Sequence, residues 1–141
     1  MFTHILVPVD GSEQAYRALD YAITLAESVS SDVKLTVLHV NPTLTLNEPP
    51  IVDIHLYESL EEEGRDILQP AIERMKATQI PFKTEVKSGD PANVISHLAD
   101  FDQHDLIVMG CRGAGLMSEP LLGSVSHKVI QHAHCPVMVI K

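Results

Sequence analysis

The stretch Ile5-Leu6-Val7-Pro8-Val9-Asp10, followed by Gly11-Ser12, sets the fold class of the chain. It is a nearly continuous apolar run that ends in a polar residue. Such a run predicts a strand covered on both faces, as in a parallel sheet between two layers of helices. Gly11 breaks the run, and the Ser12 side chain can cap a following helix. We therefore expect a buried strand, a turn and a helix at the start of the chain.

Helix-like and strand-like segments alternate outward from this stretch. Helices are expected where apolar residues recur at three- and four-residue steps, and strands where short apolar runs occur. The expected helices cover 15–29, 56–77, 91–99 and 125–133, the later expected strands cover 33–40, 81–87, 106–109 and 136–140, and 43–54 is expected to be a loop. This β-α-β-α-β-α-β-α-β order predicts an α/β fold with a doubly wound, open, parallel five-stranded sheet. The even alternation predicts one domain over 1–141.

The charge and the cysteines exclude several classes of protein. The 141 residues include 19 acidic and 10 basic ones, a net charge of −9. This balance argues against non-specific nucleic-acid binding and against attraction to an anionic membrane. Cys111 and Cys135 lack the spacing of a redox or zinc motif. No secretory signal is visible, and no apolar run approaches the roughly 20 residues of a membrane span. A cytoplasmic protein is expected.

The segment from Gly110 to Ser126 has the composition of a phosphate-binding loop. It leaves a buried strand, contains four glycines and enters a helix through Gly123-Ser124-Val125-Ser126. Glycines let the backbone approach a ligand, and the helix start offers free N–H groups and serine hydroxyls. Arg112 is a local cation. The segment lacks the lysine of a Walker A loop and the glycine spacing of the dinucleotide fingerprint. Glycines that serve only strand ends and helix caps remain the alternative.

The spacing of these glycines is shared with a known family. The segment begins with Gly110-x2-Gly113 and continues through nine residues to Gly123-Ser124. This pattern resembles the ATP-binding signature of the universal stress protein family. That family's other blocks also have counterparts in this sequence. They are the opening strand and turn Ile5–Ser12 and the segments 38–40, 88–91, 105–110 and 135–139. The resemblance therefore extends over nearly the whole chain.

The resemblance implies a fold and a site. The fold is a Rossmann-like, adenine nucleotide alpha hydrolase-like three-layer sandwich with strand order 3-2-1-4-5. The base would lie near Val9 and Val40, the ribose near Asp10, and the phosphates over Gly113, Gly123 and Ser124. Asp10 alternatively satisfies local amides at the helix start. The full set of nucleotide-binding residues is Pro8, Val9, Asp10, Val40, Met109, Gly110, Arg112, Gly113, Gly123, Ser124, Val125 and Ser126.

The same resemblance implies a function. The chain is expected to be an ATP-binding, homodimeric, nucleotide-dependent stress-response regulator that dimerises through strand 136–140. Mg²⁺ or Mn²⁺ would bind only through the phosphates, because neither ion requires a protein cage. No catalytic set and no protein metal site stand out, so slow ATP hydrolysis is the most that is expected. The alternatives are a slow ATPase or phosphotransferase, a nucleotide-free dimeric interaction module, and a pocket that prefers AMP or a cyclic nucleotide.

Overall fold

The structure is a computed structural model that describes residues 2–29, 32–42, 54–111 and 122–141. The helices and strands alternate along these residues as the sequence predicts. Their bounds are β1 (His4–Pro8), α1 (Glu13–Val29), β2 (Lys34–Pro42), α2 (Ile54–Lys76), β3 (Phe82–Gly89), α3 (Pro91–Phe101), β4 (Leu106–Gly110), α4 (Ser124–His132) and β5 (Val137–Ile140). Residues 43–53 of the predicted loop lie outside the described part, and Ile54 already belongs to α2.

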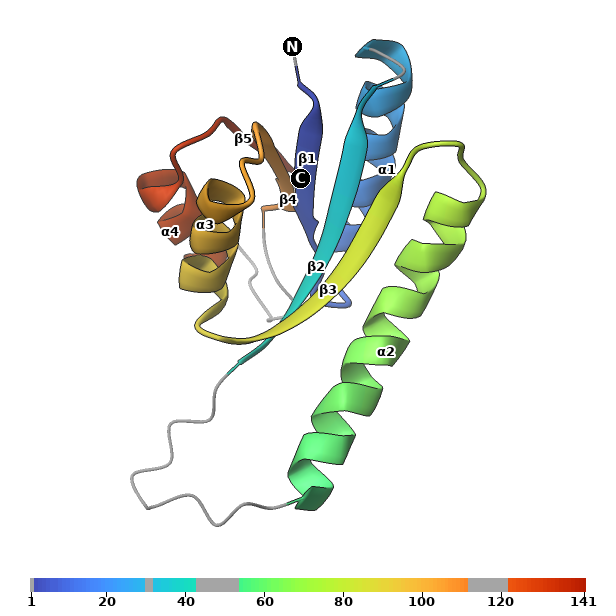
Figure 1. Ribbon diagram of the computed structural model, residues 1–141. Coiled ribbons are helices and arrows are strands. Elements are labelled where there is room, and N and C mark those ends of the chain that lie inside the picture. Colours follow the sequence, from blue (N-terminus) through green and yellow to red (C-terminus); the bar gives the residue numbers. More distant parts are fainter. Residues whose placement is uncertain (1, 30–31, 43–53, 112–121) are drawn as a thin grey trace.

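The strands form one sheet with the order β3-β2-β1-β4-β5, and each recorded pairing between neighbours is parallel. Helices α1 and α2 lie on one face of this sheet, and α3 and α4 lie on the other (Figure 1). The predicted doubly wound α/β fold and its strand order are therefore confirmed. The direction of winding reverses between β1 and β4, and ligands of such sheets bind beyond the carboxyl ends of the strands at that point.

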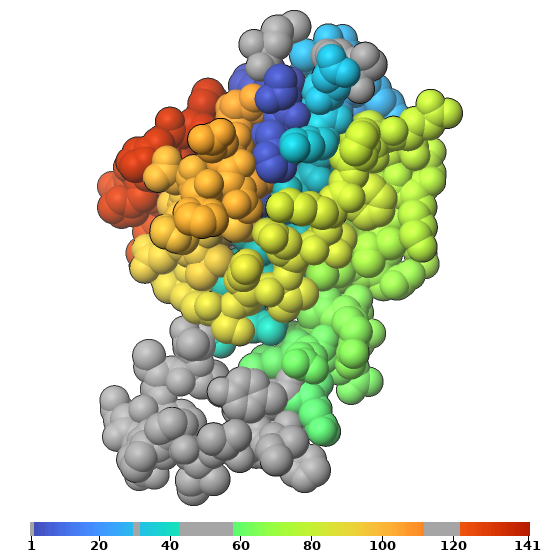
Figure 2. Space-filling model, in the orientation of Figure 1, coloured from blue at the N-terminus to red at the C-terminus, as the bar shows by residue number. Residues whose placement is uncertain are grey.

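Two apolar cores explain why the strand segments read as continuous apolar runs. Val7 and Val37 pack in the core beneath α1 and α2. Their neighbours Leu6 and Leu38 pack in the core beneath α3 and α4. Successive side chains of a strand point to opposite faces, so both kinds of position must be apolar. In the space-filling view, β3 and α3 form much of the near surface, with atoms of β1 and β2 between them (Figure 2).

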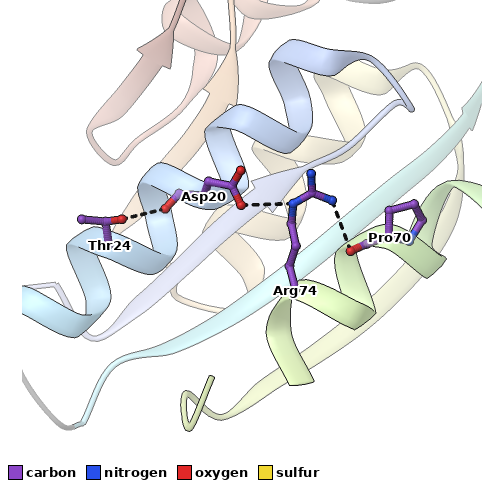
Figure 3. A network of polar contacts seen from close by, with 4 residues as sticks. All are labelled: Asp20, Thr24, Pro70 and Arg74. Atoms are coloured by element: carbon purple, nitrogen blue, oxygen red, sulfur yellow. Dashed lines mark hydrogen bonds and ion pairs between the residues drawn. The ribbon is translucent and has the colours of Figure 1, made fainter. Parts of the chain in front are cut away.

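Helices α1 and α2 are joined at the surface by an arginine. The guanidinium of Arg74 donates from Nε to Oδ1 of Asp20 at 3.1 Å and from Nη1 to the carbonyl oxygen of Pro70 at 3.4 Å (Figure 3). The Thr24 hydroxyl donates to the Asp20 carbonyl oxygen. Arg74 also lies 5.0 Å from the centroid of the Tyr16 ring. These contacts fix how α2 lies beside α1.

No helix within the described ranges is long and apolar enough to cross a membrane.

Strand β2 runs further than the sequence predicts. The strand predicted over 33–40 stops before Asn41-Pro42, because proline cannot donate to a ladder. The pairing with β1 does stop early, at Pro8 opposite Leu38. The pairing with β3 continues to Pro42 opposite Gly89. Beyond Leu38 only one side of β2 is paired, so the missing N–H of Pro42 is tolerated, and Asn41 becomes a strand residue.

Candidate functional site

A cavity of about 620 Å³ opens at the carboxyl ends of the central strands. Its walls come from the ends of β1, β2 and β4, from α2 on one side and from the start of α4 on the other. The volume lies within the range of roughly 300–1,000 Å³ that is typical of small-molecule sites. The cavity therefore lies at the reversal point of the sheet, where the topology favours ligand binding.

The predicted site residues converge on this cavity. Ten of them are described by the structure, and all ten line it: Pro8, Val9, Asp10, Val40, Met109, Gly110, Gly123, Ser124, Val125 and Ser126. The other two, Arg112 and Gly113, lie outside the described residues. The structure thus gathers residues from four separate segments of the chain at one place.

The first turn of α4 has free backbone donors next to the cavity. Gly123 is the N-cap residue and provides no side-chain cap. Its own N–H donates to the carbonyl oxygen of Cys111, and the N–H of His127 donates to Gly123. The amides of Ser124, Val125 and Ser126 have no recorded acceptor within the described residues. Uncapped amides and the positive end of the helix dipole favour an anion at this position.

Cys111 connects this helix start to the sheet. Its N–H donates to the carbonyl oxygen of Ile140 in β5 at 2.8 Å. Its carbonyl oxygen accepts from the Gly123 amide at 2.7 Å and from the Ser126 hydroxyl at 2.8 Å. The sequence predicts that the Ser126 hydroxyl faces a phosphate. In the structure Ser126 is buried and its hydroxyl holds the loop base, which leaves its amide as the group available to a ligand.

Asp10 and Ser12 organise the turn between β1 and α1. Oδ1 of Asp10 accepts from the Ser12 amide at 2.9 Å, and the Ser12 hydroxyl accepts from the Ala15 amide at 3.2 Å. Ser12 therefore caps α1 as predicted. Asp10 thus accepts a hydrogen bond from a local amide at the helix start, which was the alternative to binding the ribose. Its side chain is nevertheless exposed and lines the cavity. One carboxylate oxygen thus carries the recorded contact to the turn.

Gly110 lets β4 end directly against α1. A Cβ atom at this position would lie 3.0 Å from Cβ of Gln14 and 3.2 Å from the backbone nitrogen of Ala15. Real side-chain carbons rarely come so close to a neighbouring backbone. Glycine is therefore required for close packing of the strand end on the helix, which positions the rim of the cavity.

Several lining residues from β2, α2 and α3 are not identified by the sequence. The additional lining residues include His39, Asn41, Leu60, Glu63, Ile67 and Ile95. Helical periodicity marks the apolar face of α2, but it does not say which turn of the helix reaches the sheet edge. His39 is buried. Its Nδ1 lies 2.9 Å from the Val9 carbonyl oxygen, and its Nε2 lies 3.0 Å from Oδ1 of Asn41.

The charged side chains among the described lining residues are both acidic. They are Asp10 and Glu63, and the described lining includes no lysine or arginine. A polyanion would therefore depend on backbone amides and on its own counter-ions. No group of three or more His, Cys, Asp or Glu residues within the described residues is arranged to hold a metal ion.

A buried histidine with a lowered pKa lies at the other end of the central strands, next to the starts of β1 and β4. Burial lowers the pKa of His104 to about 4, and the neighbouring His4 acts in the same direction. The two rings lie against each other, with centroids 3.7 Å apart and ring planes tilted by 31°. Burial would raise the pKa of Asp105, but hydrogen bonds from Thr3 and His4 outweigh it and lower that pKa. This cluster is remote from the cavity and bears on stability.

Known proteins match the chain over its whole length. A family model described as the universal stress protein family matches residues 1–141. A curated universal stress protein of Methanocaldococcus jannaschii is 34% identical over 142 residues, which cover 100% of this chain and 83% of that protein. The solved structure of universal stress protein UspA from Lactobacillus plantarum has a TM-score of 0.86 and 32% identity, covering 99% of this chain and 98% of that one.

Two further solved structures contain nucleotides. A universal stress protein family protein from Arabidopsis thaliana, solved with AMP bound, has a TM-score of 0.74 and 26% identity, covering 99% of this chain and 91% of its own. A universal stress protein in complex with cAMP has a TM-score of 0.75 and 25% identity, covering 99% and 97% of the two chains. With the fold, the cavity and the full-length matches together, the chain belongs to the universal stress protein family.

Proposed function

We propose that this protein binds ATP in the cavity at the strand ends and acts as a cytoplasmic, homodimeric, nucleotide-dependent regulator of a stress response. The observation that carries the proposal is that the amides of Ser124, Val125 and Ser126, beside a cavity of ligand size, have no acceptor among the residues that the structure describes. The base would occupy the end near Val9 and Val40, and the phosphates the end near α4. Arg112 and Gly113 complete the proposed phosphate path.

AMP and cAMP in two structural neighbours support an adenine nucleotide as the class of ligand. The proposal of ATP adds the β- and γ-phosphates, for which the glycine spacing 110–124 is the argument. Mg²⁺ or Mn²⁺ would accompany these phosphates. The ion would bind through the phosphates and keep several water ligands, so it would require no cage of protein ligands.

Dedicated catalysis is not part of the proposal. Phosphoryl transfer needs groups that stabilise the charge developing on the phosphate. The described lining residues provide two carboxylates and no cationic side chain. A slow ATPase remains the second candidate, favoured by Asp10 at the cavity rim. Multiple turnovers that require Mg²⁺ and exceed those of a variant with a blocked cavity would favour it.

The first experiment is to denature the purified protein and identify any released nucleotide by mass spectrometry, then to titrate the nucleotide-free protein with MgATP. The blocked variant is Gly123→Val. The backbone of Gly123, at φ −65° and ψ 160°, is accessible to valine, so the fold should persist. We expect ATP affinity to fall about tenfold or more, because hydrogen bonds to a charged group are lost. Ala77→Val, on an exposed residue outside the cavity, is the control. Equal affinity of both variants would contradict the site.

The proposed dimer has its own test. Strand β5 is the last strand in the sheet order, and Met138 on it is 36% exposed. An apolar sheet edge favours pairing with a second copy. We expect Met138→Lys to convert a dimer into a monomer in light scattering while ATP binding stays within about threefold. Val86→Lys, on the opposite edge strand β3, should remain dimeric. A monomeric parent protein would contradict the proposed assembly.

A further inference from the structure

A mismatch in hydrogen bonding lies between His39 and Asn41, two buried residues that line the cavity. The buried ring of His39 contacts two oxygen atoms. Nδ1 lies 2.9 Å from the Val9 carbonyl oxygen, and Nε2 lies 3.0 Å from Oδ1 of Asn41. Both oxygens are acceptors, whereas a neutral imidazole has only one N–H. Only one of the two contacts can therefore be a hydrogen bond from a neutral ring.

The Val9 contact determines which nitrogen carries the proton. The backbone carbonyl of Val9 is held in place by the sheet and can only accept, so Nδ1 must be the N–H. Nε2 then has a lone pair that needs a donor. Protonating both nitrogens would satisfy both oxygens, but it would bury a positive charge on a residue that is only 5% exposed. Among the described residues, no carboxylate is hydrogen-bonded to this ring.

Rotation of the Asn41 amide by 180° removes the mismatch. The oxygen and nitrogen of an asparagine amide have nearly the same shape, and their assignment follows from the hydrogen-bond network. After rotation, Nδ2 of Asn41 donates to Nε2 of His39, and the chain Asn41–His39–Val9 is satisfied throughout. The rotation also exchanges the atom on the far side of the amide. An acceptor oxygen now stands where a donor nitrogen stood.

We propose that Asn41 reads the base of the bound nucleotide, its side-chain oxygen accepting a hydrogen bond from the exocyclic amino group of adenine. Asn41 lines the cavity beside Val40, at the end assigned to the base. The His39 ring holds its amide in one orientation, so the acceptor is preorganised. Guanine and hypoxanthine carry a carbonyl oxygen in place of that amino group, and two facing acceptors repel. The inference rests on the proposed function, because it concerns the base of the same ligand.

The test compares MgATP with MgITP, which differ at this group, in binding titrations of three proteins: the parent, Asn41→Ala, and the control Asn93→Ala on the exposed face of α3. We expect the parent and the control to prefer ATP. We expect Asn41→Ala to narrow the preference for ATP over ITP roughly three- to tenfold, the effect of one neutral hydrogen bond. The ATP affinity should fall, whereas the ITP affinity should stay the same or rise, because the repelling oxygen is gone. An unchanged preference, or equal weakening of both nucleotides, would overturn the role of Asn41 while ATP binding stands. Binding of neither nucleotide by the parent protein would overturn the proposed function itself.

A second measurement needs no variant. The ¹⁵N shifts of the His39 ring distinguish the Nδ1–H tautomer, the Nε2–H tautomer and the imidazolium. The proposal requires a neutral ring with the proton on Nδ1. A ring that is doubly protonated at neutral pH, or protonated only on Nε2, would overturn it, because the Asn41 oxygen would then face His39 instead of the cavity.

Discussion

The hydroxyl of Ser126 donates a hydrogen bond to the carbonyl oxygen of Cys111 at 2.8 Å, inside the protein and across 15 positions of the sequence. The same carbonyl accepts the Gly123 amide, and the Cys111 amide is tied to Ile140. The start of α4, which carries the proposed phosphate-binding amides, is thereby fixed to the last strand of the sheet. Cys111 therefore links the strand proposed for dimerisation to the proposed nucleotide site, because it is hydrogen-bonded to both.

The first prediction concerns this contact. Ser126→Ala removes a buried hydroxyl and leaves its acceptors with fewer partners, so the free energy of unfolding should fall by about 1 kcal/mol. Ser124→Ala is the matched control, because Ser124 is exposed and its hydroxyl has no recorded hydrogen bond among the described residues; we expect no change beyond about 0.5 kcal/mol. Urea unfolding of both variants measures the difference. Equal stabilities would show that the Cys111 contact does not hold the loop base.

The second prediction concerns the charge of the cavity. Because the described charged lining residues, Asp10 and Glu63, are both acidic, ATP should bind more weakly when Mg²⁺ is removed by a chelator, by about tenfold. Adenosine, which has no phosphate, should bind equally well in both conditions. Glu63→Gln should strengthen ATP binding up to about fivefold at low salt and less at high salt. Calorimetry at two salt concentrations measures this. Tighter ATP binding without Mg²⁺ would contradict the proposed electrostatics.

The third prediction contrasts two glycines. At Gly110 a Cβ atom would press on the backbone of α1, so Gly110→Ala should cost about 1–3 kcal/mol. At Gly64, inside α2, a Cβ atom would lie 3.4 Å from Cδ2 of His39, an ordinary contact. Gly64→Ala should therefore be neutral or stabilising by up to about 1 kcal/mol, because alanine favours helix. Thermal unfolding compares the two. A Gly110→Ala variant as stable as the parent would show that the strand end has room to move.

The fourth prediction concerns acid. Since the folded pKa of His104 is about 4 and its ordinary value is 6.5, the unfolded chain binds more protons between these values. Stability should therefore fall as the pH drops from about 6.5 to about 4, by up to about 3 kcal/mol from this residue, and this contribution should level off below pH 4. His104→Gln should flatten the decline.

The control for the acid prediction is His97→Gln, on an exposed histidine of α3. It should retain the slope of the parent protein. Denaturant unfolding at a series of pH values measures both variants. A His104→Gln variant with the parent's slope would assign the acid sensitivity elsewhere.

The fold could be predicted because its determinants are local. Continuous apolar runs such as Ile5–Val9 are required by a sheet covered on both faces, and the alternation of elements then limits the topology. The described residues of the predicted site also converge, because parallel strands end at one edge and the loops that follow them must meet there.

What could not be predicted depends on tertiary register. Asn41-Pro42 has the composition of a strand end, and only the one-sided pairing of β2 with β3 extends the strand through it. Ser126 is a residue type that can bind phosphate through its hydroxyl. Only the folded structure shows that this hydroxyl donates to the carbonyl oxygen of Cys111 instead. The contribution of Glu63 depends on which turn of α2 reaches the cavity, which periodicity does not specify.

The most direct test of the nucleotide site is a titration of the ¹⁵N-labelled protein with MgATP, followed by the backbone amide signals. We expect saturable shifts of the amide signals of Ser124, Val125 and Ser126, together with those of Val9 and Val40. Adenosine should shift Val9 and Val40 and leave the three α4 amides nearly unchanged. Two results would contradict the proposal that this cavity holds a nucleotide with its phosphates on α4. One is an ATP titration that leaves the amide signals of α4 unshifted, and the other is one that shifts only the signals of residues outside the cavity.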